Sequence, residues 1–140
     1  MNRLSNPIEN IKGHYTVVVI GSGYGGSIAA SRLSRAGVQV CLLERGKEFQ
    51  AGEFPDTPQE ALQEMQINLP KKHVGSHTGL YDFHVNEDVN VFVGCGLGGT
   101  SLINANVSLR AENRVFENEC WSEELRKDIN TLLSDGYKLA

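Results

Sequence analysis

Three glycines and an acid carry the clearest chemistry in this sequence. Gly21, Gly23 and Gly26 stand in G-x-G-x-x-G spacing, and Glu44 follows further along the chain. Glycine at the first position allows a sharp turn, at the second lets a pyrophosphate approach the backbone, and at the third lets a helix lie close to a strand. A carboxylate such as that of Glu44 can accept two hydrogen bonds from ribose hydroxyls. These residue types and this spacing predict a site for a dinucleotide.

The elements around these residues agree with such a site. Residues 17–20 are a short β-branched run, which is typical of a strand buried on both faces. Helical spacing follows the glycines until Gly37, which suits a helix C-cap, and residues 38–43 predict a second strand that ends at Glu44. The helix N-terminus would offer free N–H groups and a positive dipole end to a pyrophosphate. A tight turn without a ligand is the alternative, but it does not explain why the glycines and the acid fall in register.

The composition limits the kinds of protein that this chain can be. It has 140 residues, enough for one hydrophobic core, and is 40% hydrophobic and 21% charged, as in ordinary globular proteins. A formal net charge of -4 and the lack of a basic patch argue against nucleic acid as a partner. The apolar runs are too short to span a bilayer and residues 1–14 hold no secretory signal, so we expect a cytoplasmic protein. The cysteines form no C-x-x-C pair, which favours free thiols.

The middle of the chain predicts a loop and then a helix. Residues 47–57 carry glycine, proline and charges, and Asp56 or Thr57 could cap a helix with Pro58 in its first turn. We expect this helix to turn apolar side chains inward as far as Met65 and Ile67, and to stop at Pro70.

A polar loop and a hairpin are expected next. Residues 80–85 and 89–93 alternate apolar and polar side chains around a polar turn, as two paired strands do. Residues 71–79 read as a loop, in which His73 and His77 have a spacing that invites a metal site. Glycine and serine between these histidines disfavour a helix, and no carboxylate or cysteine completes a ligand set, so we expect no metal.

A second glycine cluster occupies residues 94–107, GCGLGGTSLINANV. It follows a predicted strand, and Thr100 and Ser101 look like the start of a helix. Two glycine-rich loops of this kind suggest one large ligand held at two places. A nicotinamide dinucleotide does not need the second loop, whereas a flavin dinucleotide has a bulky ring system that could use it. A flexible glycine loop is the alternative.

The two motifs together resemble a known family. IGSGYGGSIAA and GCGLGGTSLINANV are similar to the FAD-binding N-terminal part of the glucose-methanol-choline (GMC) oxidoreductases, in a form like that of the cholesterol oxidase branch. The resemblance covers about residues 15–125. It implies FAD as the cofactor and an α/β fold, a Rossmann-like FAD-binding βαβ domain with a parallel sheet, present here as an incomplete N-terminal fragment.

The resemblance implies cofactor contacts in three places. The adenosine ribose would bind to Glu44, and the residues lining the pyrophosphate turn would be Gly21, Gly23, Tyr24, Gly25 and Gly26. The residues along the pyrophosphate and flavin side of the second loop would be Gly99, Thr100 and Ser101. The residues approaching the isoalloxazine ring would be Asn104, Ala105 and Val107. Family members often carry glycine at the position of Ala105, and Asn104 also suits a helix cap, so a second interpretation stays open at both positions.

The resemblance also implies what this sequence lacks. In the family a histidine near the C-terminus accepts the hydroxyl proton of an alcohol while hydride passes to the flavin. No histidine of this chain stands in a matching context; the four are His14, His73, His77 and His84. We therefore assign no catalytic residue, and we expect a small alcohol or sterol substrate only if downstream chain completes the site.

The organisation predicted along the chain is a flexible lead-in over residues 1–14 and an FAD-binding portion over residues 15–140, truncated before a substrate domain. Apolar spacing after Ser122 predicts a final helix that reaches Leu133. A truncated fragment, a split-gene product and a degenerate copy are the possible interpretations. A sheet with few strands would leave apolar surface uncovered, through which the chain could associate with a partner.

Three functions are compatible with these patterns. The favoured one is the FAD-binding portion of a GMC-type oxidoreductase that acts on CH–OH groups and is inactive alone. The alternatives are a nicotinamide-binding dehydrogenase domain and a non-catalytic remnant that binds a dinucleotide, or only a partner protein through uncovered apolar surface.

Overall fold

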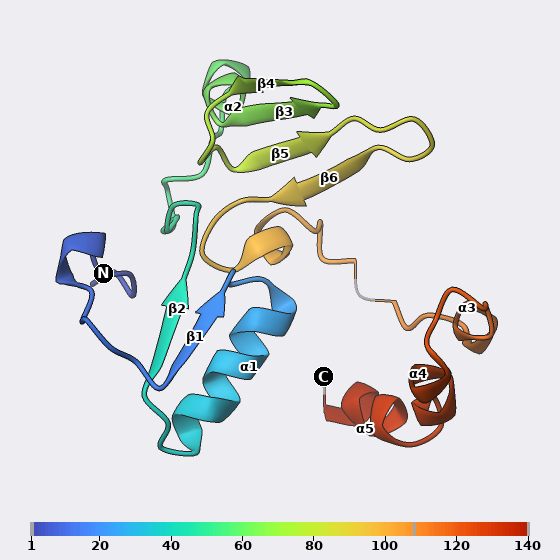
Figure 1. Cartoon of the computed structure of the whole chain (residues 1–140). Coiled ribbons are helices and arrows are strands. Elements are labelled where there is room, and N and C mark those ends of the chain that lie inside the picture. The colour runs from blue at the N-terminus through green and yellow to red at the C-terminus, as the bar shows by residue number, and fades with distance from the viewer. Residues whose placement is uncertain (1, 108, 140) are drawn as a thin grey trace. The chain divides into compact units, whose positions relative to one another are not determined.

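The computed structural model describes residues 2–107 and 109–139. The chain divides into two compact units, Met1–Asn104 and Ala105–Ala140. The first unit holds both glycine motifs and all the strands found among the described residues, and the second holds helices (Figure 1). None of the helices over the described residues is long and apolar enough to cross a membrane.

The first unit begins with the predicted strand, helix and strand. β1 (Val17–Ile20) leads into α1 (Tyr24–Arg35), and the chain returns through β2 (Val40–Leu43), which pairs with β1 in parallel. Ala36 is the C-cap of α1, and Gly37 follows with a φ of +81°, a left-handed conformation that favours glycine. The predicted α/β class with a parallel βαβ pair is therefore confirmed.

The face of β1 away from α1 is apolar and open. A Cβ at Gly26 of α1 would lie 3.4 Å from Val19, so the helix covers the side of β1 on which Val19 lies. Side chains alternate along a strand, and Val18 and Ile20 on the other side are 51% and 86% exposed. Parallel sheets are ordinarily covered on both faces, so this face is unusually bare.

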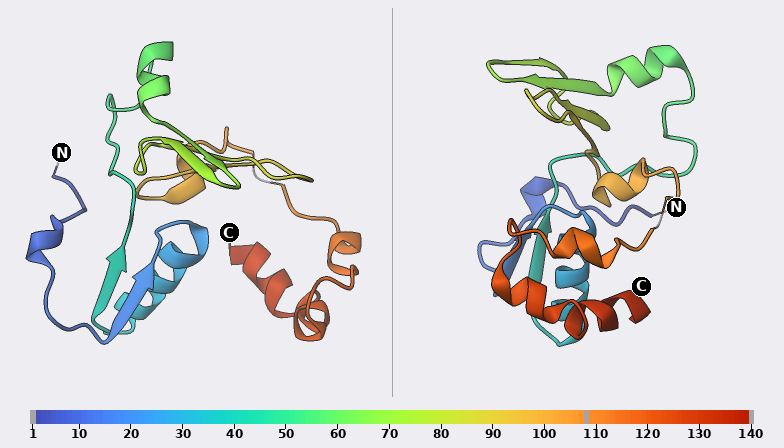
Figure 2. Two further views of the ribbon diagram at one scale, coloured as in Figure 1. Left: turned by 45° about the horizontal axis from the view of Figure 1, so that its top comes forward. Right: turned by 90° about the vertical axis from the view of Figure 1, so that its right-hand side faces the viewer.

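A second sheet follows, in the strand order β4-β3-β5-β6. Its strands are β3 (Met65–Leu69), β4 (Lys72–Gly75), β5 (Tyr81–His84) and β6 (Val91–Gly94). β5 and β6 form the predicted antiparallel hairpin, while β3 pairs with β4 in antiparallel and with β5 in parallel. Figure 2 shows the strands of this sheet side by side, with the short helix α2 where the chain enters it.

Two predictions for this region were wrong. α2 (Pro58–Gln63) starts at the expected cap, where Thr57 and Glu60 form a capping box, but it ends well before Pro70. The residues from Met65 on, expected in the helix, form β3, and the expected loop over residues 71–79 contains β4. β3 is bonded to a strand on each side, and such long-range pairing outweighs the weak helical pattern of its sequence.

The second unit contains α3 (Asn113–Phe116), α4 (Glu123–Asp128) and α5 (Leu132–Leu139). Ser122 caps α4 as predicted, accepting a hydrogen bond from the backbone N–H of Leu125 at 3.3 Å. The single helix expected to reach Leu133 is instead two helices. At the break, the backbone N–H and the hydroxyl of Thr131 both donate to the carbonyl of Asp128, at 3.1 and 3.3 Å, and such a local bond competes with helix continuation.

Candidate cofactor-binding site

The first glycine turn joins β1 to α1 through two glycines that the fold itself requires. Gly21 has a φ of +87° and donates its N–H to the carbonyl of Leu43 at 2.8 Å, which ties the turn to β2. A Cβ at Gly26 would lie 1.9 Å from the carbonyl oxygen of Gly21. The predicted close approach of helix and strand at Gly26 is therefore confirmed.

Gly23 and Gly25, in contrast, face open space. Gly23 is the N-cap of α1 and makes no side-chain cap, and Gly25 lies in its first turn. A Cβ at either position would meet no heavy atom within 4 Å. The first N–H groups of a helix lack partners within the helix, so this open side exposes donors and the positive end of a 12-residue helix.

The second glycine loop runs directly against the first. Gly98 and Gly99 have φ angles of +117° and +63°, and the 3-10 helix η2 (Gly99–Leu102) begins at the second of them. A Cβ at Gly99 would lie 2.7 Å from the Cα of Gly23. The helix expected near Thr100 is this single tight turn. The structure thus brings together the two loops that the sequence separates widely.

Ser22 fastens the two loops to each other. Its side chain is fully buried, and its hydroxyl lies 2.5 Å from Oε2 of Glu44 and 3.2 Å from the carbonyl oxygen of Gly96, to both of which it can donate. The same hydroxyl accepts the N–H of Gly98 at 2.9 Å. Ser22 was not predicted as a site residue, because the glycine motif leaves its position open and its partners in the second loop lie 74 and 76 residues away in the sequence.

Glu44 lies at the end of β2, as predicted, and is held by the turn around it. Its Oε2 accepts from the N–H of Ser22 at 2.9 Å as well as from the hydroxyl, and its Oε1 accepts from the N–H of Gly46 at 2.8 Å. Partial burial works to raise the pKa of Glu44, but the hydrogen bonds from Ser22 and Gly46 outweigh it and lower the pKa below its ordinary value. The carboxylate is therefore ionised at neutral pH, and Oε1 retains room for a further donor.

The turn after β2 packs closely against the backbone of the second loop. A Cβ at Gly46 would lie 2.4 Å from the backbone nitrogen of Gly96. Lys47 pairs with Gly96 in a parallel bridge, and its backbone carbonyl accepts a hydrogen bond from the N–H of Leu97 at 2.9 Å. Gly96 belongs to the predicted second glycine cluster, but Gly46 was not predicted as a site residue, because its need for glycine arises from a contact between distant segments.

The remaining predicted residues of the first unit line the second loop. The hydroxyl of Thr100 accepts the N–H of Gly94 at 3.3 Å, and that of Ser101 donates to the carbonyl of Gly98 at 2.9 Å. Nδ2 of Asn104 donates to the hydroxyl of Tyr24 at 2.7 Å, a bond between the second loop and α1. Thr100 and Ser101 thus stabilise the loop's own geometry, and their contact with a cofactor stays a prediction.

Ala105 and Val107 belong to the second unit, so the structure does not place them against the glycine turns. Ala105 has a φ of +53°, in the region that favours glycine, which agrees with the glycine that family members often carry there. Val107 is 64% exposed.

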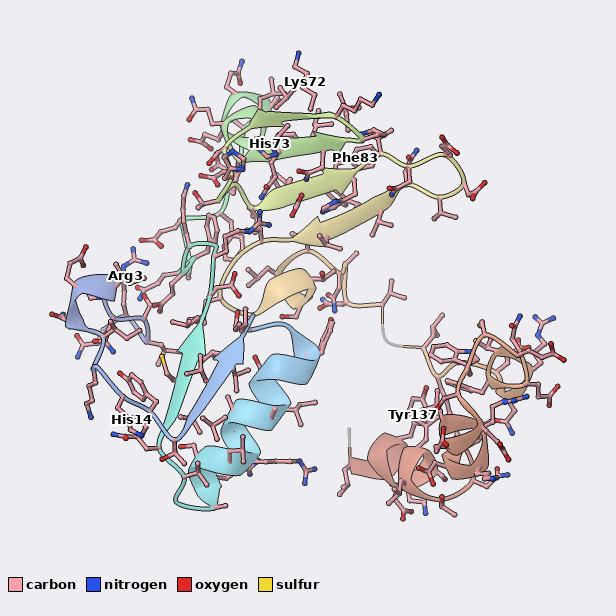
Figure 3. All side chains as sticks on the ribbon, viewed as in Figure 1. Arg3, His14, Lys72, His73, Phe83 and Tyr137 are labelled. Carbon is pink, nitrogen blue, oxygen red and sulfur yellow. The ribbon has the colours of Figure 1, made fainter. Side chains whose placement is uncertain are left out.

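The histidines do not gather at this site. His73 and His77 stack with ring centroids 3.8 Å apart, and Figure 3 shows His73 on the second sheet, well away from His14 before β1. Among the described residues no group of histidine, cysteine and acid side chains has the geometry to hold a metal ion. The cysteines are free thiols, as expected.

A family of FAD binding domains and several known oxidases match this chain in sequence. A family model described as an FAD binding domain matches residues 14–53, which contain the first glycine turn and Glu44. A cholesterol oxidase of Mycobacterium tuberculosis (strain ATCC 25618 / H37Rv) is 34% identical over 112 residues, which are 80% of this chain and 18% of that protein. The long-chain-alcohol oxidase FAO1 of Arabidopsis thaliana is 28% identical over 123 residues, which are 88% of this chain and 14% of that protein.

These matches extend well beyond the first glycine turn. The digeranylgeranylglycerophospholipid reductase 2 of Methanococcoides burtonii, in contrast, matches over only 39 residues, 28% of this chain, with 45% identity. The oxidases match more than three quarters of the chain, although the chain spans less than a fifth of their own length. FAD is the cofactor that the matched family model indicates, as predicted. The resemblance to the glucose-methanol-choline oxidoreductases is thereby confirmed, since over most of its length this chain is similar to cholesterol and long-chain-alcohol oxidases.

Proposed function

We propose that this chain is the FAD-binding portion of a GMC-type flavoprotein oxidoreductase acting on the CH–OH group of an alcohol or sterol. The match to an FAD binding domain and the similarity to cholesterol and long-chain-alcohol oxidases support the proposal. When bound, FAD would supply the acceptor for the hydride of the alcohol.

One structural observation carries the cofactor assignment. Gly21, Gly26, Gly46 and Gly99 must each be glycine because of a positive φ or a backbone atom that a Cβ would approach within 3 Å. Gly23 and Gly25 have neither reason. Glycine is well tolerated at the N-cap position of Gly23, but at Gly25, within the first turn of α1, it costs up to about 1 kcal/mol relative to alanine. A ligand that lies against the backbone at the start of α1 explains why both lack a side chain.

Each part of this site would hold a different part of the dinucleotide. The N–H groups at the start of α1 would donate to the pyrophosphate, whose negative charge the helix dipole stabilises. Oε1 of Glu44, held in place by Gly46, would accept from a ribose hydroxyl. Tyr24 and Asn104, bonded to each other, would border the side of the second loop predicted to face the flavin.

We also propose that substrate turnover needs polypeptide equivalent to the rest of the relatives, in which the match accounts for 18% or less of the length. No described histidine lies among the glycine turns to accept a proton from an alcohol. The exposed Val18 and Ile20 on the open face of β1 would pack against that further polypeptide.

A titration of the purified chain with FAD tests the proposal. Bound FAD should remain with the protein through gel filtration and keep its visible absorbance, and Gly23→Val should abolish this binding because its side chain would occupy the pyrophosphate's place. Gly13→Val is the matched control, since Gly13 lies outside the site with equally open surroundings. Selective binding of NADH without retention of FAD would overturn the proposal in favour of a nicotinamide domain. Binding of neither, by a chain that circular dichroism shows to be folded, would overturn it in favour of a remnant that binds only a partner protein.

A further inference from the structure

A buried carboxylate lies next to the proposed site but outside it. Asp82 on β5 has a side chain that is only 3% exposed, and both of its oxygens have partners. Oδ2 accepts from Nη2 of Arg45 at 2.7 Å, and Oδ1 accepts from Nδ2 of Asn68 at 2.6 Å, with Nε2 of His84 at 3.0 Å from the same oxygen. A carboxylate removed from water needs such donors, so its position and that of Arg45 are fixed together.

Arg45 connects this carboxylate to the end of β2. It stands between Glu44 and Gly46, the two residues joined by the hydrogen bond to Oε1 of the carboxylate. Its Nη1 donates to Oε1 of Gln66 at 3.4 Å, and Gln66 is itself fully buried and paired with Asp82 in the register of β3 and β5. The guanidinium therefore holds the turn after β2 to two neighbouring strands of the second sheet.

We propose that Asp82 is a positioning residue of the cofactor site, which fixes Arg45 and thereby aims the carboxylate of Glu44 at the ribose hydroxyls of the adenosine half. This inference rests on the proposed function.

Asp82 can influence Glu44 because the turn after β2 is tightly packed and has little room to move. The backbone of Gly46 lies against Cys95 and Gly96, where a Cβ would come within 2.6 Å of three backbone atoms, so the turn has little room on that side. The side chain of Arg45 is 53% exposed, so packing contributes little to its order, and its polar bonds, above all the ion pair with the buried Asp82, hold it in place. Without it, the Glu44–Gly46 segment keeps its fold but loses one of the contacts that set its direction. The groups of a binding site must be held within about 0.5 Å of the productive geometry by the residues that support them.

Two ligands that differ only in the ribose hydroxyls test this inference. The parent chain should bind ADP about tenfold more tightly than 2′,3′-dideoxy-ADP, since hydrogen bonds to an ionised carboxylate are among the stronger ones. In Asp82→Asn that ratio should fall towards one, through weaker binding of ADP and unchanged binding of the dideoxy ligand. Asp88→Asn makes the same chemical change in the exposed turn between β5 and β6 and should keep the parental ratio.

A second variant keeps the test sharp if Asp82→Asn does not fold. Arg45→Lys retains the positive charge, but the single ammonium group of lysine cannot bond to Asp82 and Gln66 together as the planar guanidinium does. The ratio of the affinities for ADP and 2′,3′-dideoxy-ADP should therefore fall, while the circular dichroism spectrum stays that of the parent. If the binding of ADP and of 2′,3′-dideoxy-ADP weakens equally, Asp82 only stabilises the fold and the inference is overturned. An unchanged ratio of the two affinities in either folded variant would overturn it as well. If the parent chain binds neither ADP nor FAD, the proposed function fails and the inference fails with it; if the parent shows the ratio and both variants retain it, only the inference fails.

Discussion

Replacing Gly25 with alanine should make the empty protein more stable and its complex with FAD weaker. Gly25 lies in the first turn of α1, where a Cβ would meet no heavy atom within 4 Å, so alanine enters the helix without a clash. The gain in helix propensity is about 0.5–1 kcal/mol. The same methyl group would stand on the backbone that the pyrophosphate is proposed to approach.

The expected loss of FAD binding is larger than the gain in helix propensity, so FAD should reverse which of the two proteins, parent or Gly25→Ala, is the more stable. A tenfold loss of affinity corresponds to about 1.4 kcal/mol. FAD at about 100 times the parental Kd adds roughly 2.7 kcal/mol to the stability of the parent, but only about 1.4 kcal/mol to a variant with a tenfold higher Kd. The difference of about 1.3 kcal/mol exceeds the gain in propensity, so the variant is the more stable protein without FAD and the less stable one with it.

Urea unfolding followed by circular dichroism measures the stability of the empty protein without FAD and the increment in stability that FAD adds. Gly136→Ala is the matched control, because Gly136 lies within α5 and also has no heavy atom within 4 Å of a Cβ. It should add stability without changing the increment from FAD. If Gly25→Ala keeps the parental affinity for FAD, the argument that the open side of Gly25 receives a ligand is refuted.

Two further changes probe the site from the protein side. Gly26→Ala should destabilise the empty protein by about 1–3 kcal/mol or more, since its Cβ would lie 1.9 Å from the carbonyl oxygen of Gly21; a parental urea midpoint would contradict the packing of α1 on β1. Because the pKa of Glu44 is lowered in the folded chain, its ionised form stabilises the fold fully above its ordinary value of 4.5, and this stabilisation is lost as pH falls through the lowered value. The stability difference between the parent and Glu44→Gln should therefore shrink on acidification below about pH 4.5, and a difference that stays constant between pH 7 and pH 3 would exclude that role.

The parts of the fold predicted correctly are those whose determinants lie close together in the sequence. The strand, glycine turn, helix and second strand each carry a local pattern, and their pairing in register follows from the short connection between them. The hairpin of β5 and β6 follows for the same reason, since alternating side chains flank a short polar turn. Local agreement of this kind needs no knowledge of the rest of the chain.

The parts that could not be predicted depend on partners far away in the sequence. β3 looked like the end of a helix because its strand character comes from bonds to β4 and β5. The need for glycine at Gly46 comes from the backbone of Gly96, and no local pattern reveals that contact. For the site, the sequence indicated two glycine loops at one ligand, but the serine that joins them became visible only in three dimensions.

The bonds of Ser22 also set the order in which this protein can be assembled. They reach Gly96 and Gly98, 74 and 76 residues further along the chain. During synthesis the first glycine turn therefore leaves the ribosome well before the residues that fasten it exist, while β1, α1 and β2 already have what they need to pair. We expect the early βαβ segment to hold its strands and helix but to leave Ser22 and Glu44 loosely ordered, so that the cofactor site matures only after the chain has been made past Gly98.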